Sequence, residues 1–246
     1  MKKTAILLDG GFVYKVLKRI HARSPNPDDI VRLCEDICTK GGEELFRIYY
    51  YDCPPFQGKK PHPLLKRDIE FSKSHAAARM SAFHESLAHK DHVAFRRGIL
   101  LFKGWQFHER VANLLMQKGK VTLTDSNKTV SIQVELPLES LGKHRIIDLA
   151  RLPKKPEEIL RMALGRLVKP VLEQKRVDMK IGLDVAWLSS RRIVDRIAMV
   201  TADTDFVPVM KFVRREGVQV IIVPLGQRLS PELIEHADEV RRIDMG

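Results

Sequence analysis

The stretch Val200-Thr201-Ala202-Asp203-Thr204-Asp205-Phe206 carries the pattern from which the fold of this chain is predicted. The apolar run 197–200 comes before the two carboxylates and predicts a buried strand, and residues 207–215 after them predict a helix. Asp203 and Asp205 therefore lie where a strand passes into a helix. In an open parallel sheet the carboxyl ends of the strands form the edge at which ligands bind. The pattern thus predicts a ligand site at this edge.

The start of the chain has the same organisation. Residues 4–8 form a compact apolar run that predicts a strand buried on both faces, and Asp9 with two glycines ends it. Helical periodicity at 12–23 and 28–39 precedes a further strand at 45–51. Strand, helix, helix and strand in this order are typical of the crossover connection in parallel sheets.

The C-terminal part returns to this alternation. Asp178 begins a predicted helix, and predicted strands follow at 196–201, 219–223 and, as an edge strand, 240–243. Between them the pattern predicts a helix over 205–216 and a short helix that starts at Ser230-Pro231. The expected fold class is α/β: an open, mostly parallel sheet with helices on both faces.

The middle of the chain, about 54–174, departs from this alternation and is predicted to be an inserted, mixed α/β section. Its patterns predict a helix at 68–89, a strand or hairpin at 95–107, strands within 121–136 and a helix at 157–174. A length of 246 residues favours one domain, 1–246, with this insertion over two independent domains.

Composition limits the classes of function. The net charge of +12 and the pI of about 9.7 favour an anionic partner, of which nucleic acid is the usual one. Three cysteines without framework spacing favour a reducing compartment, with Cys34 and Cys38 as buried apolar residues rather than zinc ligands. The apolar run after Met1 is too short for a signal-peptide core or a membrane span, so we expect a cytoplasmic protein.

Aspartates at three separate places, Asp9, Asp178 and the pair Asp203 and Asp205, are predicted to converge on one divalent metal. Mg²⁺ and Mn²⁺ prefer oxygen ligands, activate water and neutralise charge in phosphodiester hydrolysis. Without a metal the carboxylates repel each other and at least one pKa rises. Each aspartate singly also fits a capping or turn role. Thr201 and Thr204 either hydrogen-bond metal-bound water or cap a helix.

Asp184 lies six residues after Asp178, so the two side chains point to different sides of a helix. Asp184 is therefore given a secondary role: it orients a base or water, or it pairs with Lys180 or Arg191. Lys180, one turn into the same helix, is either a phosphate contact or a solvated lysine.

The central section supplies basic and aromatic residues that suit RNA. The predicted phosphate contacts are Lys59, Lys60, Lys66, Arg67, Arg96, Arg97 and Lys103. Phe56 and Trp105 either stack on bases or fill the core. The histidines of this section lack the partner motif of a zinc site and are interpreted as surface residues or phosphate contacts: His75, His84, His89 and His92.

Three blocks of the sequence, 5–12, 175–184 and 200–208, resemble the NYN-domain family of the PIN-like nuclease superfamily in order, spacing and strand context. The third block is the most specific. The long central section resembles the insertion of bacterial members. Two positions depart from the family pattern: Phe12 stands where many relatives carry Asn, and Ala202 stands where Gly is common.

The resemblance implies a Mg²⁺- or Mn²⁺-dependent ribonuclease with Asp9, Asp178 and Asp203 as catalytic metal ligands and Asp205 as a further ligand. It implies RNA, single-stranded or structured, as partner, with no membrane; a homodimer is also open. Two alternatives remain. One is a catalytically silent RNA-binding module, since some members act as regulators. The other is a nucleotide-sugar glycosyltransferase, since Asp203 and Asp205 form an Asp-x-Asp pair after a strand. It is ranked last because it leaves Asp9 and Asp178 without a role.

Overall fold

The computed structural model describes residues 1–63, 67–108, 120–126, 129–135 and 168–244. The chain divides into two compact units, one made of Met1–Gln57, Phe71–Leu101 and Glu173–Gly246, the other of Gly58–Glu70 and Phe102–Leu172. The first unit contains both ends of the chain and all the predicted aspartates. No helix within the described residues has the length and apolar character needed to cross a membrane.

A six-stranded sheet forms the centre of the first unit, and every strand in it runs parallel to its neighbours. From one edge to the other its strands are β12 (Glu239–Val240), β11 (Gln219–Ile222), β10 (Arg196–Val200), β1 (Lys3–Asp9), β2 (Glu44–Asp52) and β5 (Val93–Arg97). The chain adds β2 and β5 on one side of β1 and returns on the other side with β10. The predicted α/β fold is confirmed, and the strand order reverses between β1 and β10, where ligands bind in such sheets.

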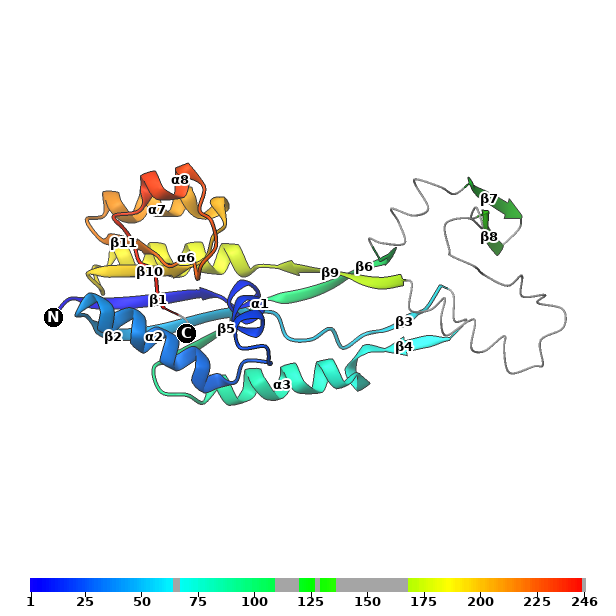
Figure 1. Cartoon of the computed structure of the whole chain (residues 1–246), viewed down its shortest axis with the longest axis horizontal. Helices are drawn as coiled ribbons and strands as arrows, with labels where there is room; N and C mark the ends of the chain where they lie inside the picture. Colours follow the sequence, from blue (N-terminus) through cyan, green and yellow to red (C-terminus); the bar gives the residue numbers. More distant parts are fainter. Residues whose placement is uncertain (64–66, 109–119, 127–128, 136–167, 245–246) are drawn as a thin grey trace. The chain divides into compact units, whose positions relative to one another are not determined.

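Helices cover both faces of this sheet (Figure 1). One face packs against α6 (Val177–Ser190), α7 (Val207–Arg215) and α8 (Pro231–His236), and the other against α1 (Gly10–Ile20), α2 (Pro27–Gly41) and α3 (His75–Ala88).

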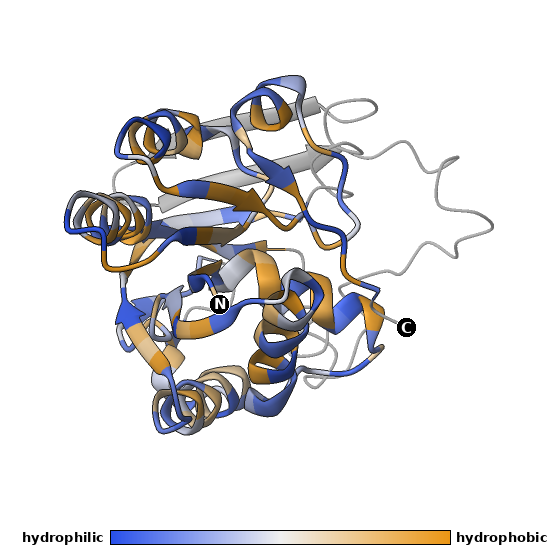
Figure 2. Ribbon diagram, turned by 90° about the vertical axis from the view of Figure 1, so that its left-hand side faces the viewer, coloured by the Kyte–Doolittle hydropathy of each residue, from blue (hydrophilic) through white to orange (hydrophobic). Residues whose placement is uncertain are grey.

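Strand β1 shows why both layers form. Its alternate residues Ala5 and Leu7 belong to the core beneath the first group of helices, while Ile6 and Leu8 belong to the core beneath the second. Figure 2 shows the mainly hydrophobic strands between the two helical layers. Burial on both faces explains the continuous apolar run of the sequence.

Gly10 fixes where α1 begins. A Cβ atom at this position would lie 2.6 Å from Cε1 of Tyr50 and 2.6 Å from the backbone oxygen of Tyr51, so only glycine fits without a shift of β2. The Tyr50 hydroxyl also donates a hydrogen bond to the Gly10 carbonyl at 3.2 Å. This close contact holds the preceding residue, Asp9, at the end of β1.

The predicted helix at 68–89 is wrong in its first part. Residues Asp68–Glu70 form strand β4, which pairs antiparallel with β3 (Lys59–Pro61), and a short 3-10 helix, η1 (Phe71–Lys73), follows. The helix itself begins only after Ser74, whose hydroxyl accepts a hydrogen bond from the Ala77 amide at 3.1 Å. This N-cap places the helix start at His75, seven residues later than the apolar periodicity indicates.

The predicted element at 95–107 is two strands in different sheets. Strand β5 ends at Arg97 and belongs to the main sheet, whereas β6 (Ile99–Phe107) pairs with β9 (Val168–Lys175). Gly98 separates them, and a Cβ there would lie 2.6 Å from the Cys53 sulfur.

The predicted helix at 157–174 is wrong over 168–174, because this segment is strand β9. Val168 and Val171 favour a strand, and Pro170 lacks the amide that a helix interior uses. The earlier part, 157–167, lies outside the described residues. The alternation within 121–136 is confirmed as an antiparallel hairpin of β7 (Lys120–Ser126) and β8 (Thr129–Glu135).

Candidate active site

The carboxyl ends of β1 and β10 bring Asp9 and the segment that carries Asp203 to one edge of the sheet. Leu8 of β1 lies opposite Val200 of β10, so Asp9 and Thr201 follow at neighbouring strand ends. Asp9 in turn lies opposite Tyr51 of β2. The expectation that β1 and the strand before Asp203 are neighbours is therefore confirmed.

Asp9 is a half-buried carboxylate that also caps α1. Its Oδ1 accepts a hydrogen bond from the Phe12 amide at 3.2 Å. Burial raises the pKa of Asp9, the hydrogen bond from Phe12 lowers it, and the charges of Asp178 and Asp52 raise it again, with a net increase above the ordinary value of 3.8. The capping role and the charge interaction with Asp178 thus occur together.

Asp178 lies in the first turn of α6 but does not cap it. The cap residue is Arg176, which has a left-handed φ of 71° and makes no side-chain cap hydrogen bond. The pKa of Asp178 is raised, first by partial desolvation and then by the charges of Asp203 and Asp205. Asp178 therefore interacts electrostatically with the aspartates of both other segments.

The turn after β10 holds Asp203 and Asp205. The buried Thr201 accepts a hydrogen bond from the Asp203 amide at 3.1 Å, and Asp203 Oδ1 accepts one from the Asp205 amide at 3.0 Å. Asp203 is the N-cap of the 3-10 helix η4 (Thr204–Phe206), which leads into α7. The side chains of Asp203, Thr204 and Asp205 are exposed at the sheet edge.

These side chains offer only oxygen donors, which is the chemistry that Mg²⁺ and Mn²⁺ prefer. The pKa values of Asp9 and Asp178 are raised first by burial and then by the charges of neighbouring aspartates, and a bound cation offsets both effects. Among the residues that the structure describes, no three His, Cys, Asp or Glu side chains lie close enough together to form a ready-made metal site. The donor chemistry fits a divalent metal, while a preformed cage is not present in that part of the chain.

Asp52, the last residue of β2, is a carboxylate of the same edge that the sequence analysis missed. Its Oδ2 is 3.0 Å from Nε2 of the buried His84, and its Oδ1 accepts a hydrogen bond from the Cys53 amide at 2.7 Å. The charge of Asp52 contributes to the raised pKa of Asp9. A signal was present, because Asp52 follows a predicted strand just as Asp9 does.

Asp184 is paired within the fold, though with a residue other than the two expected partners. Its Oδ2 accepts hydrogen bonds from the Tyr51 hydroxyl and from Arg96 Nε, each at 2.9 Å. Lys180 instead donates to the Arg97 carbonyl at 2.9 Å. Arg96 and Lys180, both predicted RNA contacts, are thus engaged in internal contacts.

Several of the remaining RNA candidates have internal contacts as well. Lys59 pairs with Asp68 at 3.1 Å, and the Lys60 ammonium lies 5.5 Å from the centre of the Phe102 ring. The half-buried Trp105 donates to the Pro61 carbonyl at 2.9 Å. Phe56 packs edge-on against Phe71, and the Arg97 guanidinium lies over the Phe95 ring. Lys66 lies outside the described residues. The roles of these side chains in RNA binding stay predictions.

The histidines and cysteines of the first unit are dispersed. His75, His89 and His92 are exposed as expected, and His89 Nδ1 contacts the Glu85 carbonyl oxygen at 2.7 Å. The interpretation of His84 as a surface residue is wrong, because His84 is buried against Asp52. Cys34, Cys38 and Cys53 are buried and unbridged, which agrees with their interpretation as small apolar residues.

Comparison with known proteins gives one family. The family model described as NYN domain matches residues 108–244. This is more than half of the chain, and it includes Asp178, Asp203 and Asp205. No curated protein sequence gives a significant match. A crystal structure of a protein of unknown function from Vibrio parahaemolyticus is similar with a TM-score of 0.46 and 13% identity, over 99% of this chain and 94% of that one.

Proposed function

The chain belongs to the NYN-domain family of PIN-like nuclease domains, and on this premise we propose that it is a metal-dependent endoribonuclease. The proposed reaction is hydrolysis of RNA phosphodiester bonds at the carboxyl edge of the central sheet. Asp9, Asp178 and Asp203 are the proposed catalytic metal ligands, and Asp205 is a further ligand.

The observation that supports this proposal is the charge interaction among aspartates from three separate segments. The charge of Asp178 raises the pKa of Asp9, and the charges of Asp203 and Asp205 raise that of Asp178. Such repulsion destabilises the fold unless a cation offsets it. Capping explains Asp9 and Asp203, but it does not explain Asp178, which makes no cap hydrogen bond.

The proposed metal ligands differ in how deeply they are buried. Asp9 lies deeper, held by the Phe12 amide, whereas Asp178, Asp203 and Asp205 are exposed where a phosphodiester can approach. A bound Mg²⁺ or Mn²⁺ would activate the attacking water and neutralise charge on the phosphoryl oxygens. The hydrogen bond from Asp203 to Thr201 fixes the turn that carries the exposed carboxylates.

Further residues have proposed supporting roles. Thr201 and Thr204 border the carboxylates, and Asp184 acts indirectly by holding Arg96 and Tyr51. The proposed RNA contacts of the first unit are Lys180, Arg96 and Arg97, and those of the second unit are Lys59 and Lys60.

Cleavage of labelled RNA tests the proposal. Purified protein is incubated with single- and double-stranded RNA and DNA in Mg²⁺, Mn²⁺ or chelator. Asp9→Asn, Asp178→Asn and Asp203→Asn should each lower the RNA cleavage rate at least about a hundredfold, because a lost metal ligand removes several kcal/mol of transition-state stabilisation. Asp36→Asn is the matched control, since Asp36 is an exposed carboxylate on α2.

Cleavage that persists in chelator, or in all three variants, contradicts the proposed site. RNA binding by the wild-type protein without cleavage in either metal would instead identify a silent RNA-binding module.

A further inference from the structure

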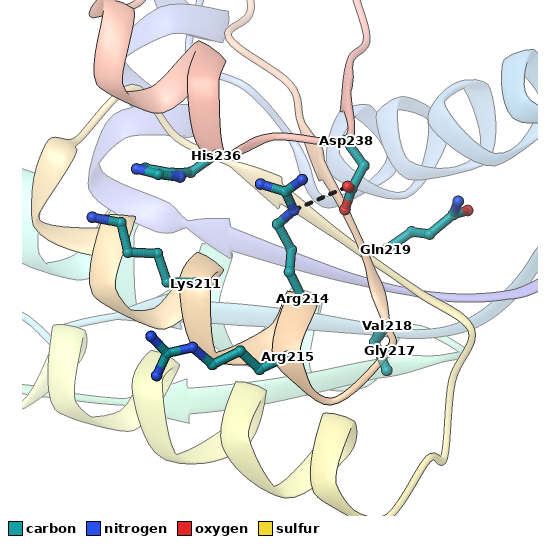
Figure 3. Close-up of a pocket in the computed structure, with 8 residues that line it drawn as sticks. All are labelled: Lys211, Arg214, Arg215, Gly217, Val218, Gln219, His236 and Asp238. Atoms are coloured by element: carbon teal, nitrogen blue, oxygen red, sulfur yellow. Dashed lines mark hydrogen bonds and ion pairs between the residues drawn. The ribbon is translucent and has the colours of Figure 1, made fainter.

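A second charged site lies at the far end of α7 from the carboxylates. A cavity of about 530 Å³ is bordered by basic side chains of α7 and α8, and we call it the α7–α8 pocket (Figure 3). Its basic and acidic lining residues are Lys211, Arg214, Arg215, His236 and Asp238. Helix α7 begins beside η4 at the carboxyl edge and ends next to β11 at the amino edge of the sheet. The pocket is therefore separate from the proposed active site.

The positive charge of this pocket is largely uncompensated. Asp238 is the single acidic residue among its described lining residues, and it already accepts hydrogen bonds from Arg214 Nε at 3.0 Å and from the Val220 amide at 2.8 Å. Lys211 and Arg215 are exposed, and their side chains make no ion pair or hydrogen bond within the described part of the chain. In Figure 3 no dashed contact joins either side chain to the other residues drawn. Two cations are thus available to an anionic ligand.

The helix dipole accounts for only part of this arrangement. Basic residues in the last turn of a helix interact favourably with its carbonyl end, which explains Arg214 and Arg215. Lys211 lies one turn earlier, and His236 comes from the end of a different helix, α8. Their convergence on one cavity needs a further reason, and a bound anion supplies it.

We propose that the α7–α8 pocket binds backbone phosphates of the RNA strand whose cleavage is proposed at the carboxyl edge; the RNA part of this inference rests on the proposed function. Lysine and arginine neutralise phosphates, and such contacts position a strand without reading its sequence. None of the described residues that line the pocket is Phe, Tyr or Trp, so it has no stacking platform for a base. The pocket therefore suits the backbone of a strand better than a nucleobase.

The length of α7 sets the spacing of the two sites. Its nine residues span about 13 Å at about 1.5 Å per residue. Stacked nucleotides rise about 3.4 Å each, so a strand that reaches from the carboxylates to the pocket needs about four nucleotides beyond the scissile bond. RNA shorter than this can occupy one site only, which makes the contribution of the pocket dependent on RNA length.

Binding measurements on the full chain test this inference. The Asp203→Asn background slows the proposed cleavage, and fluorescence anisotropy gives the affinity for single-stranded RNA of 12 and of 3 nucleotides over a range of salt. The pocket variant is Lys211→Gln with Arg215→Gln. The control is Lys18→Gln with Arg19→Gln, which removes the same charge from exposed residues in the last turn of another helix, α1.

For the 12-nucleotide RNA, the pocket variant should reduce the slope of log affinity against log salt by about 1.4, since each lost phosphate contact in single-stranded RNA accounts for about 0.7. The control and the 3-nucleotide RNA should show little change. Each single substitution should give about half of the effect. Thermal melts should show that both variants are folded.

Equal losses in pocket and control variants would show diffuse attraction and overturn the inference. A loss that is the same for 3 and 12 nucleotides, or complete competition by millimolar inorganic phosphate, would identify a small-anion site and also overturn it. Because this experiment measures binding, its result does not depend on the outcome of the cleavage assay. A wild type that does not cut RNA contradicts the proposed function alone.

Discussion

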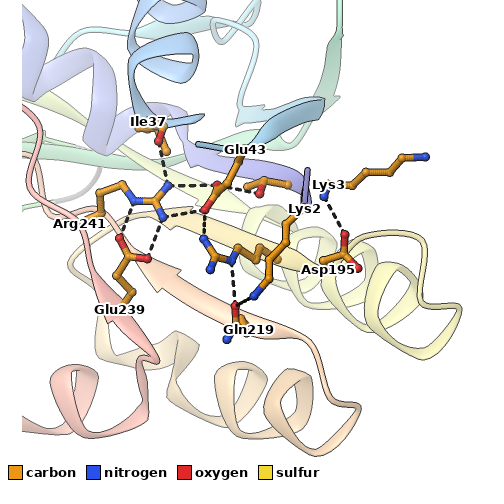
Figure 4. Close-up of polar contacts among 10 residues, drawn as sticks. Lys2, Lys3, Ile37, Glu43, Asp195, Gln219, Glu239 and Arg241 are labelled. Atoms are coloured by element: carbon orange, nitrogen blue, oxygen red, sulfur yellow. Dashed lines mark hydrogen bonds and ion pairs between the residues drawn. The ribbon is translucent and has the colours of Figure 1, made fainter. Parts of the chain in front are cut away.

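Replacement of Glu43 by Gln tests how the amino edge of the sheet is held together. Glu43 is a buried carboxylate with 6% of its surface exposed, and it accepts hydrogen bonds from Thr4 Oγ1 at 2.8 Å and from Arg241 Nη2 at 2.8 Å (Figure 4). It also pairs with Arg196 of β10. The single carboxylate thus links the segment before β2 to β1, β10 and the residue after β12.

The expected cost of Glu43→Gln is about 3 kcal/mol of unfolding free energy. Gln keeps the shape but leaves the Arg241 guanidinium, whose side chain is 2% exposed, without its buried counter-charge. Removal of one partner of a buried pair costs about 3–5 kcal/mol. The lower end of this range applies, because Arg241 keeps its ion pair with Glu239 and its hydrogen bond to the Ile37 carbonyl. Against a total stability of about 5–15 kcal/mol this loss is large.

Urea denaturation at pH 7, extrapolated to water, measures this loss. Glu239→Gln is the control, because the Glu239 side chain is 42% exposed and its pairing with Arg241 should contribute about 1 kcal/mol or less. A loss below about 1 kcal/mol in Glu43→Gln would refute the reasoning.

Acid should remove the difference between wild type and Glu43→Gln. Burial raises the pKa of Glu43, but hydrogen bonds from Arg241, Thr4 and Arg196 outweigh it and hold the pKa below the ordinary value of 4.5. Because the pKa of the folded state is depressed, the stabilisation is complete above pH 4.5 and is lost as the pH falls through the folded-state value. A difference that persists unchanged in strong acid would contradict this assignment.

Three further predictions concern the carboxyl edge. Gly10→Ala should lower the free energy of unfolding by about 1–3 kcal/mol, because its Cβ would lie 2.6 Å from ring and backbone atoms of β2. Gly182 lies inside α6, and a Cβ there would meet its nearest neighbour, Val209 Cγ2 of α7, at an ordinary 3.6 Å, so Gly182→Ala should instead raise the free energy of unfolding by about 0.5–1 kcal/mol. Equal effects of the two substitutions in urea denaturation would refute both predictions. Without divalent metal at pH 7, Asp178→Asn should melt at a higher temperature than wild type, since the raised pKa means that the ionised carboxylate destabilises the fold. Added Mg²⁺ should reverse this order by stabilising wild type alone, and an unchanged order would contradict metal binding at Asp178. Arg96→Gln and Asp184→Asn should be coupled by about 1 kcal/mol in a double-mutant cycle, and additive losses would show that their 2.9 Å contact contributes nothing.

The central sheet could be predicted from the sequence because a strand that is buried on both faces is a continuous apolar run. Residues 4–8 and 197–200 are continuous apolar runs, and each lies in a strand with a core on both sides. The position of Asp9 and Asp203 just after these runs placed them at strand ends. The helix prediction failed at β9, where Val168, Pro170 and Val171 already disfavour a helix and pairing with β6 completes a strand.

The candidate site was predictable only in part. Asp9, Asp178 and Asp203 follow local patterns, but the link of Asp184 to Arg96 joins residues 88 positions apart. The position of Asp52 after a predicted strand was a local signal, but its contact with His84 and its charge interaction with Asp9 join residues from separate segments.

By itself, the sequence determined which segments become strands and helices and which carboxylates end them, since hydrophobic periodicity and turn residues act over a few neighbouring positions. Tertiary structure alone decided that β10 returns beside β1, that Asp178 meets the charges of Asp9 and Asp203, and that Lys211 and Arg215 share a pocket with His236. The physical reason is that these contacts join residues distant in sequence, and only the packing of the two cores against the sheet brings such residues together.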